Sequence, residues 1–171
     1  MFAQTLGSTT LGVNGILINV EVDMGNGLPS FDIVGLADAA VRESRERVRA
    51  AIKNSGFRLP ARKTTINLAP ADIRRDSSGL DLPIAIGLLV AAGFISQDSI
   101  ADTMFAGELS LDGKLRGIAG LLPMAIHCQK QGIQKLVVSP ENSNEALLVE
   151  GLTVYAPQYL SELIRYINGD E

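Results

Sequence analysis

The residues best placed to do chemistry are four cations on one face of a predicted helix that starts near Asp38 and ends at about Asn54: Arg42, Arg45, Arg49 and Lys53. At about 100° per residue these four positions fall within roughly 80° of one another, so they form one basic ridge that also includes Glu46. Like charges four residues apart destabilise a helix by about 0.2–0.5 kcal/mol per pair. A ridge kept against that repulsion indicates an anionic partner. The alternative is a solvated face whose arginines pair with acids elsewhere in the fold.

A loop between a predicted strand and a buried helix is a second candidate anion site. Residues 72–81 place two arginines and two serines ahead of the helix: Arg74, Arg75, Ser77 and Ser78. Backbone N–H groups at a helix N-terminus, beside two arginines, suit a phosphate or a carboxylate. Asp76 and Asp81 would repel such an anion. The alternative is a capping loop whose serines and aspartates satisfy those N–H groups internally.

Other chemistries find little support in the sequence. His127 and Cys128 are adjacent on a predicted helix and have no further His or Cys to join them, which excludes a zinc site within one chain. No GxxxxGK[ST] phosphate loop occurs, and the carboxylates are scattered. A single cysteine, no charged leader followed by an apolar run, and no apolar run of about 18 residues together predict a cytoplasmic protein without a membrane partner.

Charge is segregated along the chain. The formal net charge is -4 over 171 residues, yet the window 42–75 holds ten of the fifteen basic residues and only three acids. That window carries +7 and the remainder carries -11, a distribution that can attract a polyanion locally. Aromatic residues are only 5% and tryptophan is absent, which argues against a stacking platform for single strands. The ten basic residues are Arg42, Arg45, Arg47, Arg49, Lys53, Arg58, Arg62, Lys63, Arg74 and Arg75.

Hydrophobic periodicity predicts a mixed α/β fold. Clean alternation at 13–24 predicts a half-buried strand, and the near-continuous apolar run at 80–95 predicts a buried helix. Asp112-Gly113 between short alternating runs predicts a hairpin within 104–116. Further strands are expected at 31–35, 63–68, 136–139 and 153–156, and further helices at 118–131, 144–150 and 160–167. We expect one domain, built as a two-layer sandwich with helices packed on a sheet.

Two long runs are specific enough to indicate a family: GLPSFDIVGLADAAVRESRERVRAAIKNSGF at 27–57 and INLAPADIRRDSSGLDLPIAIGLL at 66–89. They closely resemble the N-terminal domain of the ComM/YifB family of magnesium-chelatase-like AAA+ ATPases; one departure is Ala37, where the family usually has proline. The resemblance implies a domain at 1–168, with 169–171 starting a linker to an absent AAA+ module. It further implies a hexameric, ATP-driven DNA helicase that promotes branch migration in natural transformation. ATP and Mg²⁺ are then expected in the absent module, and no cofactor in this domain.

A more distant resemblance covers the run at 106–142, AGELSLDGKLRGIAGLLPMAIHCQKQGIQKLVVSPEN. It is similar to the proteolytic domain of Lon and to the C-terminal domain of RadA, and it implies their two-layer α/β fold, shared with domain 2 of a small-subunit ribosomal protein. The Lon dyad positions fall on Gly79 and Leu122, which supply neither a nucleophile nor a base. The resemblance therefore implies a protease fold without catalytic residues.

These observations predict a non-catalytic domain that contributes DNA contact and ring assembly to a homo-hexameric motor. Its partners would be single-stranded or branched DNA and its own AAA+ module. One alternative is a residual Ser–Lys peptidase that uses Ser77 or Ser78 with Lys63 or Lys114. A second is a pure subunit-interaction module in which the arginines serve contacts between subunits. The expected phosphate contacts come from Arg42, Arg45, Arg49, Lys53, Arg74 and Arg75.

Overall fold

The strands of the computed structural model follow the predicted pattern closely. The structure describes residues 1–35, 38–70 and 78–169. Strands at every predicted position are confirmed, together with one at the N-terminus that the hydrophobic pattern does not predict. In chain order they are β1 (Phe2–Leu11), β2 (Asn14–Gly25), β3 (Ser30–Val34), β4 (Lys63–Ala69), β5 (Thr103–Ala106), β6 (Glu108–Leu109), β7 (Leu115–Arg116), β8 (Lys135–Val138) and β9 (Thr153–Tyr155).

The helices also lie where the sequence predicts them. The helix expected near 144–150 is shorter than predicted. The α-helices are α1 (Asp38–Asn54), α2 (Asp81–Ala91), α3 (Leu121–Lys130), α4 (Ser143–Ala146) and α5 (Leu160–Ile167), with short 3-10 turns η1 (Ser78–Leu80), η2 (Gln97–Ile100) and η3 (Pro140–Asn142). Within the described ranges, no helix combines the length and the apolar character needed to cross a bilayer.

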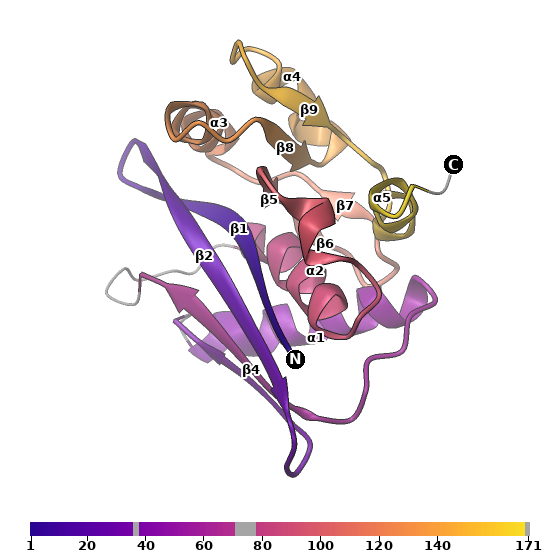
Figure 1. Cartoon of the computed structure of the whole chain (residues 1–171). Coiled ribbons are helices and arrows are strands. Elements are labelled where there is room, and N and C mark those ends of the chain that lie inside the picture. Colours follow the sequence, from indigo (N-terminus) through magenta and orange to yellow (C-terminus); the bar gives the residue numbers. More distant parts are fainter. Residues whose placement is uncertain (36–37, 71–77, 170–171) are drawn as a thin grey trace.

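The strands assemble into one large mixed sheet. Among the described residues, seven strands pair in the order β3-β4-β2-β1-β5-β8-β9 (Figure 1). β2 runs antiparallel to both of its neighbours, β1 and β4, and the other adjacent pairs are parallel. β6 and β7 form a separate antiparallel hairpin, which confirms the hairpin predicted around Asp112-Gly113.

Two hydrophobic cores lie on opposite faces of the sheet. Adjacent residues of β5 divide between them, with Phe105 in the core that contains α1, α2 and α5, and Met104 in the core that contains α3. On β2, by contrast, Val20 and Val22 are buried while Asp23, pointing the other way, is exposed. The α/β class is therefore confirmed. The expected two-layer sandwich describes only the β3-β4 edge of the sheet, because α3 adds a further layer against β2 and the strands beyond it, where the backbone of Pro123 leaves no room for a Cβ on Gly15 of β2.

The unpredicted strand β1 carries no large apolar residue on the buried face that contacts α2. Its residues that face α2 are small, since the helix lies directly against the backbone. A Cβ on Gly7 would come within 2.8 Å of the Pro83 side chain. Next to it, the Thr5 hydroxyl donates a hydrogen bond to the Pro83 carbonyl at 2.7 Å. Close approach of a helix, rather than hydrophobic alternation, determines the composition of this strand.

Candidate nucleic-acid interface

Helix α1 separates a buried side from a charged side. Ser44, Val48 and Ala51 recur at helical spacing and are all buried, as the apolar stripe in the sequence predicts. Arg47 lies between them in sequence, three residues after Ser44 and four before Ala51, so it projects from the edge of the same stripe. Its side chain is consequently drawn toward the core rather than toward the basic ridge.

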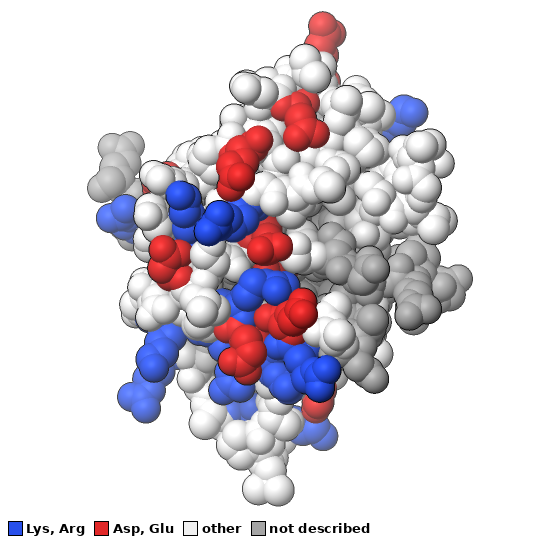
Figure 2. All heavy atoms as spheres, turned by 180° about the vertical axis from the view of Figure 1, so that it is seen from behind, with Lys and Arg blue, Asp and Glu red and all other residues white. Residues whose placement is uncertain are grey.

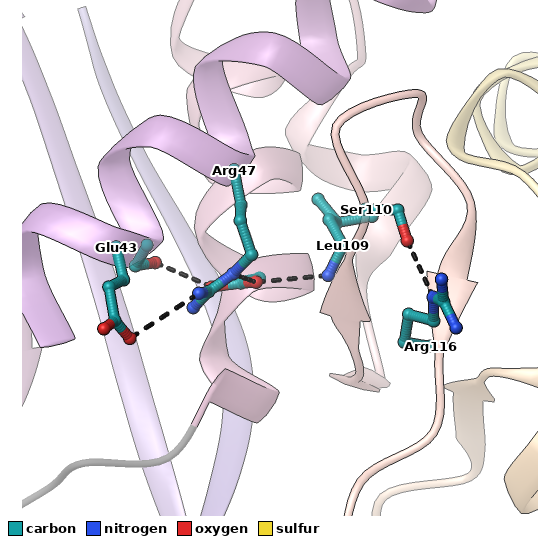
Figure 3. A network of polar contacts seen from close by, with 7 residues as sticks. Glu43, Arg47, Leu109, Ser110 and Arg116 are labelled. Atoms are coloured by element: carbon teal, nitrogen blue, oxygen red, sulfur yellow. Dashed lines mark hydrogen bonds and ion pairs between the residues drawn. The ribbon is translucent and has the colours of Figure 1, made fainter.

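Arg47 is paired with the buried carboxylate of Asp81 at the start of α2 (Figure 3). The Arg47 Nε donates to Asp81 Oδ2 at 2.6 Å and Nη2 donates to Oδ1 at 3.2 Å. The Ser44 hydroxyl donates to Oδ1 at 2.7 Å, and the Leu109 backbone N–H donates to Oδ2 at 3.1 Å. This cluster, which we call the Asp81 network, ties together α1, α2 and the β6–β7 hairpin.

The charges in the Asp81 network perturb one another. Burial raises the pKa of the Asp81 carboxyl above its ordinary value, while the Arg47 guanidinium, the Leu109 N–H and the Ser44 hydroxyl oppose that rise. The hydrogen bond to Asp81 raises the pKa of Arg47, against the lowering effect of burial. Arg47 also approaches Glu43, with Nη1 and Oε2 separated by 3.9 Å. Arg47 therefore has a structural role and is not available to an external anion.

The basic ridge itself, Arg42, Arg45, Arg49 and Lys53, lies on the outer side of α1. Arg42, Arg49 and Lys53 are exposed. Arg45 donates to the Phe31 carbonyl at 3.3 Å, and the Arg49 guanidinium lies 5.7 Å from the centroid of the Phe31 ring. Within the part of the chain that the structure describes, no carboxylate forms an ion pair with any of these four cations. The alternative in which the ridge is neutralised by acids elsewhere in the fold is not seen among these residues.

The face that carries α1 is the most basic part of the surface in view. Seen from behind (Figure 2), Lys and Arg side chains gather over its middle and lower part, with acidic side chains between them. Glu43 and Glu46 are exposed and come from α1 itself. Basic and acidic side chains are therefore mixed on this surface. The ridge carries a net positive charge, but the surface is not uniformly basic.

A groove lies beside the ridge, between the C-terminal half of α1 and the segment 56–62. One hollow of about 720 Å³ is lined by Arg49, Lys53, Phe57 and Arg58, with Glu46 as the acidic residue among its lining. A second hollow of about 260 Å³ is lined by Arg62 together with Arg49 and Leu59, the two residues that it shares with the first. We call the two hollows together the basic groove.

The second candidate site, residues 72–81, lies mostly outside the described residues, and this includes Arg74, Arg75 and Ser77. Of its described residues, 78–81, the Gly79 carbonyl and the Asp81 carboxylate are engaged within the chain. The Leu82 N–H donates to the Gly107 carbonyl at 3.1 Å, and the Asp81 carboxylate at the start of α2 is held by Arg47. Of the donors at this helix start, the Leu82 N–H is therefore satisfied from within the chain.

The positions that match the Lon dyad lie on separate elements. Gly79 is buried in η1, and Leu122 is half-buried in α3. Across residues 1–35, 38–70 and 78–169, no serine hydroxyl is hydrogen-bonded to a lysine ammonium, so neither Lys63 nor Lys114 is engaged with Ser78. Among these residues, the Ser–Lys pairing that a peptidase requires is not formed.

Metal-binding side chains are dispersed over the described structure. No group of three or more His, Cys, Asp or Glu side chains comes together in the described ranges. Cys128 is buried in the core beneath α3, and burial raises the pKa of its thiol to about 12. Cys128 therefore belongs to the hydrophobic core.

Three arginines have roles that the sequence pattern does not assign. Arg47 falls in the basic window, although its spacing from Ser44 and Ala51 could have identified it as an inward side chain. Arg58 and Arg62 also fall in the basic window, but their place on the groove depends on how the segment after α1 returns to β4. No local pattern indicates that return.

Comparisons with known proteins agree with the resemblance seen in the sequence. The family model for subunit ChlI of Mg-chelatase matches residues 20–142. The competence protein ComM of Haemophilus influenzae is 39% identical over 162 residues, which cover 95% of this chain and 32% of that protein. The uncharacterized protein YifB of Escherichia coli is 41% identical over 159 residues, covering 93% and 31%. The chain thus spans about a third of the length of these curated relatives.

A more remote relative accords with the Lon-like run. The Lon protease of Buchnera aphidicola subsp. Schizaphis graminum is 19% identical over 172 residues, which cover 95% of this chain and 22% of that protein.

Proposed function

Because the chain belongs to the family of the ChlI subunit of Mg-chelatase, we propose that it is the non-catalytic N-terminal domain of a ComM-like AAA+ motor and that its basic ridge binds the phosphate backbone of DNA. The observation that carries this proposal is the set of exposed cations on α1 with no carboxylate partner among the described residues. Lys and Arg bind phosphates without sequence preference and with a strong dependence on salt.

The buried side of α1 supports the same proposal. A helix that carries several cations must be held firmly if it is to present them at fixed spacing. The Asp81 network fixes α1 against α2 and the β6–β7 hairpin through four hydrogen bonds. The ridge is therefore anchored from beneath, and its outward cations are positioned before any ligand arrives.

The motor activity belongs, in this proposal, to parts of the protein outside this chain. The sequence has no phosphate loop of the GxxxxGK[ST] type, so we place ATP and Mg²⁺ in a following AAA+ module. A hexameric ring would bring six copies of the ridge together, and avidity would multiply modest individual affinities. In this scheme the domain keeps a Lon-like fold as a scaffold, and the whole protein is a DNA helicase that drives branch migration.

The test is a salt titration of binding to branched DNA by the longer protein that carries this domain. Changing Arg42, Arg45 and Lys53 to alanine together should lower the affinity and reduce the salt slope by about one for each phosphate that is no longer neutralised. A matched variant changes three exposed cations of other elements, Lys130, Lys135 and Arg165, and should leave both unchanged. Unchanged affinity and slope in the ridge variant would refute the proposal. If reversing the charge of these three ridge residues instead dissociates the oligomer and leaves DNA binding unchanged, the domain is a subunit-interaction module.

A further inference from the structure

The basic groove beside α1 has a shape and charge that the ridge alone does not explain. We propose that it is a channel that binds the backbone of single-stranded DNA. This inference rests on the proposed function and specifies which form of DNA the site binds. The channel runs from the first hollow, bounded by Lys53 and Arg58, to the second, bounded by Arg62. Arg49 lines both hollows and therefore lies where they meet.

Charge favours an anionic strand in this channel. Among the described residues, four cations line it, Arg49, Lys53, Arg58 and Arg62, against the single carboxylate of Glu46. None of the four forms an ion pair within the described ranges; the Arg62 guanidinium donates to the Asn26 amide oxygen, at 3.3 Å. The cations come from both sides of the groove, two from α1 and two from the segment 58–62. An occupant must therefore enter between them to reach all four.

The concave shape of the groove favours single-stranded over double-stranded DNA. A duplex is stiff and presents its phosphates on a convex surface, so on the outer ridge it would contact Arg49 and Lys53 and miss the two cations across the groove, Arg58 and Arg62. A single strand is flexible and can follow a groove, which is how cationic channels that track one strand bind it. Half-buried Phe57 adds an apolar surface to the larger hollow. The low aromatic content of the chain therefore does not exclude this channel, because its cations, rather than stacking, carry the binding.

The experiment measures binding of a fluorescein-labelled oligothymidylate and of a duplex of equal length to the 171-residue chain by anisotropy, across a range of salt concentrations. The groove variant, Arg58→Ala with Arg62→Ala, should bind the single strand about tenfold more weakly and lower the salt slope by about 1.4, the value for two phosphates of a single strand. Its affinity for the duplex should change by less than about twofold. The control variant, Lys130→Ala with Arg165→Ala, removes two exposed cations from α3 and α5 and should change neither.

A second variant guards against loss of folding. Glu46→Gln removes a carboxylate from the lining of the groove and should strengthen single-strand binding by about two- to threefold, a gain that misfolding cannot produce. If the groove variant binds the single strand as well as the unmodified chain does, while ridge variants lose affinity, the channel is refuted and the proposed function stands. An equal loss for single strand and duplex refutes the choice of strand. If the unmodified chain binds neither DNA, the channel is refuted, and the proposed function is decided by the salt titration of the longer protein, in which avidity acts.

Discussion

Arg47 and Lys53 lie on α1 less than two turns apart, yet their surroundings are opposite. Arg47 is held by a fully buried carboxylate, whereas Lys53 is exposed and has no ion pair among the described residues. A helical offset of six residues rotates a side chain by about 240°, enough to move it from the core edge to the outer surface. Charge counts along a sequence merge these two residues into one basic window, although only one of them is available to a ligand.

This difference leads us to expect that substitutions on the two sides of α1 change different properties, stability on one side and DNA affinity on the other. Disruption of the Asp81 network should lower the free energy of unfolding, because a buried charge loses its partner. Disruption of the ridge should leave stability nearly unchanged and lower affinity for DNA, because exposed cations contribute little to folding. Substitutions on each side of the helix test this division, and the largest effect is expected at Arg47.

Arg47→Met should produce the largest loss of stability. Methionine keeps much of the volume of the side chain but leaves the Asp81 carboxylate without its cation. We expect the free energy of unfolding to fall by about 3 kcal/mol, the lower end for a broken buried pair, because the Leu109 N–H and the Ser44 hydroxyl still donate to Asp81. Denaturant unfolding followed by circular dichroism measures the change. The double variant Arg47→Met with Asp81→Asn should recover part of the loss, and a single-variant loss below about 1 kcal/mol would contradict the assigned role of the pair.

The loss in Arg47→Met should depend on pH. The folded-state pKa of Asp81 already lies above its ordinary value because of burial, and removal of the guanidinium, which opposes the rise, moves it further in the same direction. The folded state then holds a proton more tightly than the unfolded state. The stability gained from protonation is fully present below the unfolded pKa and is lost as pH rises through the folded pKa. The difference from the unmodified chain should therefore narrow as pH falls through the folded-state pKa of Asp81 in the variant; a difference that stays constant down to the unfolded pKa would show that Asp81 does not titrate over that range.

Ser44→Ala should have an intermediate effect. The substitution removes the buried hydroxyl that donates to Asp81 at 2.7 Å, while the Arg47 guanidinium and the Leu109 N–H remain. We expect a loss of about 1.5 kcal/mol, in the range for a hydrogen bond to a charged group. Ser55→Ala is a useful comparison, since that hydroxyl donates to the Ala51 carbonyl at the end of the same helix and should contribute less. Equal losses in the two variants would place Ser44 outside the network.

The contrast between local sequence pattern and contacts made in three dimensions also explains which elements the sequence predicts. β2 alternates and α2 is apolar on all sides, so both follow from hydrophobic period alone, as does the outward direction of the ridge. β1 does not follow from it, because its small residues are suited to contact with Pro83. The layer formed by α3 does not follow either, because the pattern of a helix predicts that it packs, but not on which face of a sheet.

The residues of the candidate site divide in the same way, into those that local pattern predicts and those that depend on the fold. Positions on α1 follow from its 100° period, so the ridge could be placed before the structure. The Arg47–Asp81 pair joins residues 34 apart in sequence, and the basic groove joins α1 to a segment beyond it. Such contacts depend on the path of the chain in three dimensions. The sequence supplies the cations, and the fold decides which of them remain unpaired.

Lys53→Ala should have the smallest effect on stability. Lys53 lies four residues after Arg49, so the two like charges repel along the helix, and the structure provides no described carboxylate to offset them. Alanine removes that repulsion but also removes a cation from the last turn of α1, where it interacts favourably with the helix dipole, so the free energy of unfolding should change by less than about 0.5 kcal/mol. Both contributions should shrink at high salt, which screens surface charges. The same variant should bind DNA more weakly, because the lysine lines the groove. A residue whose removal leaves the fold intact and weakens binding serves its ligand, whereas a loss of more than about 1 kcal/mol on removing Lys53 would place it with Arg47 as a structural residue.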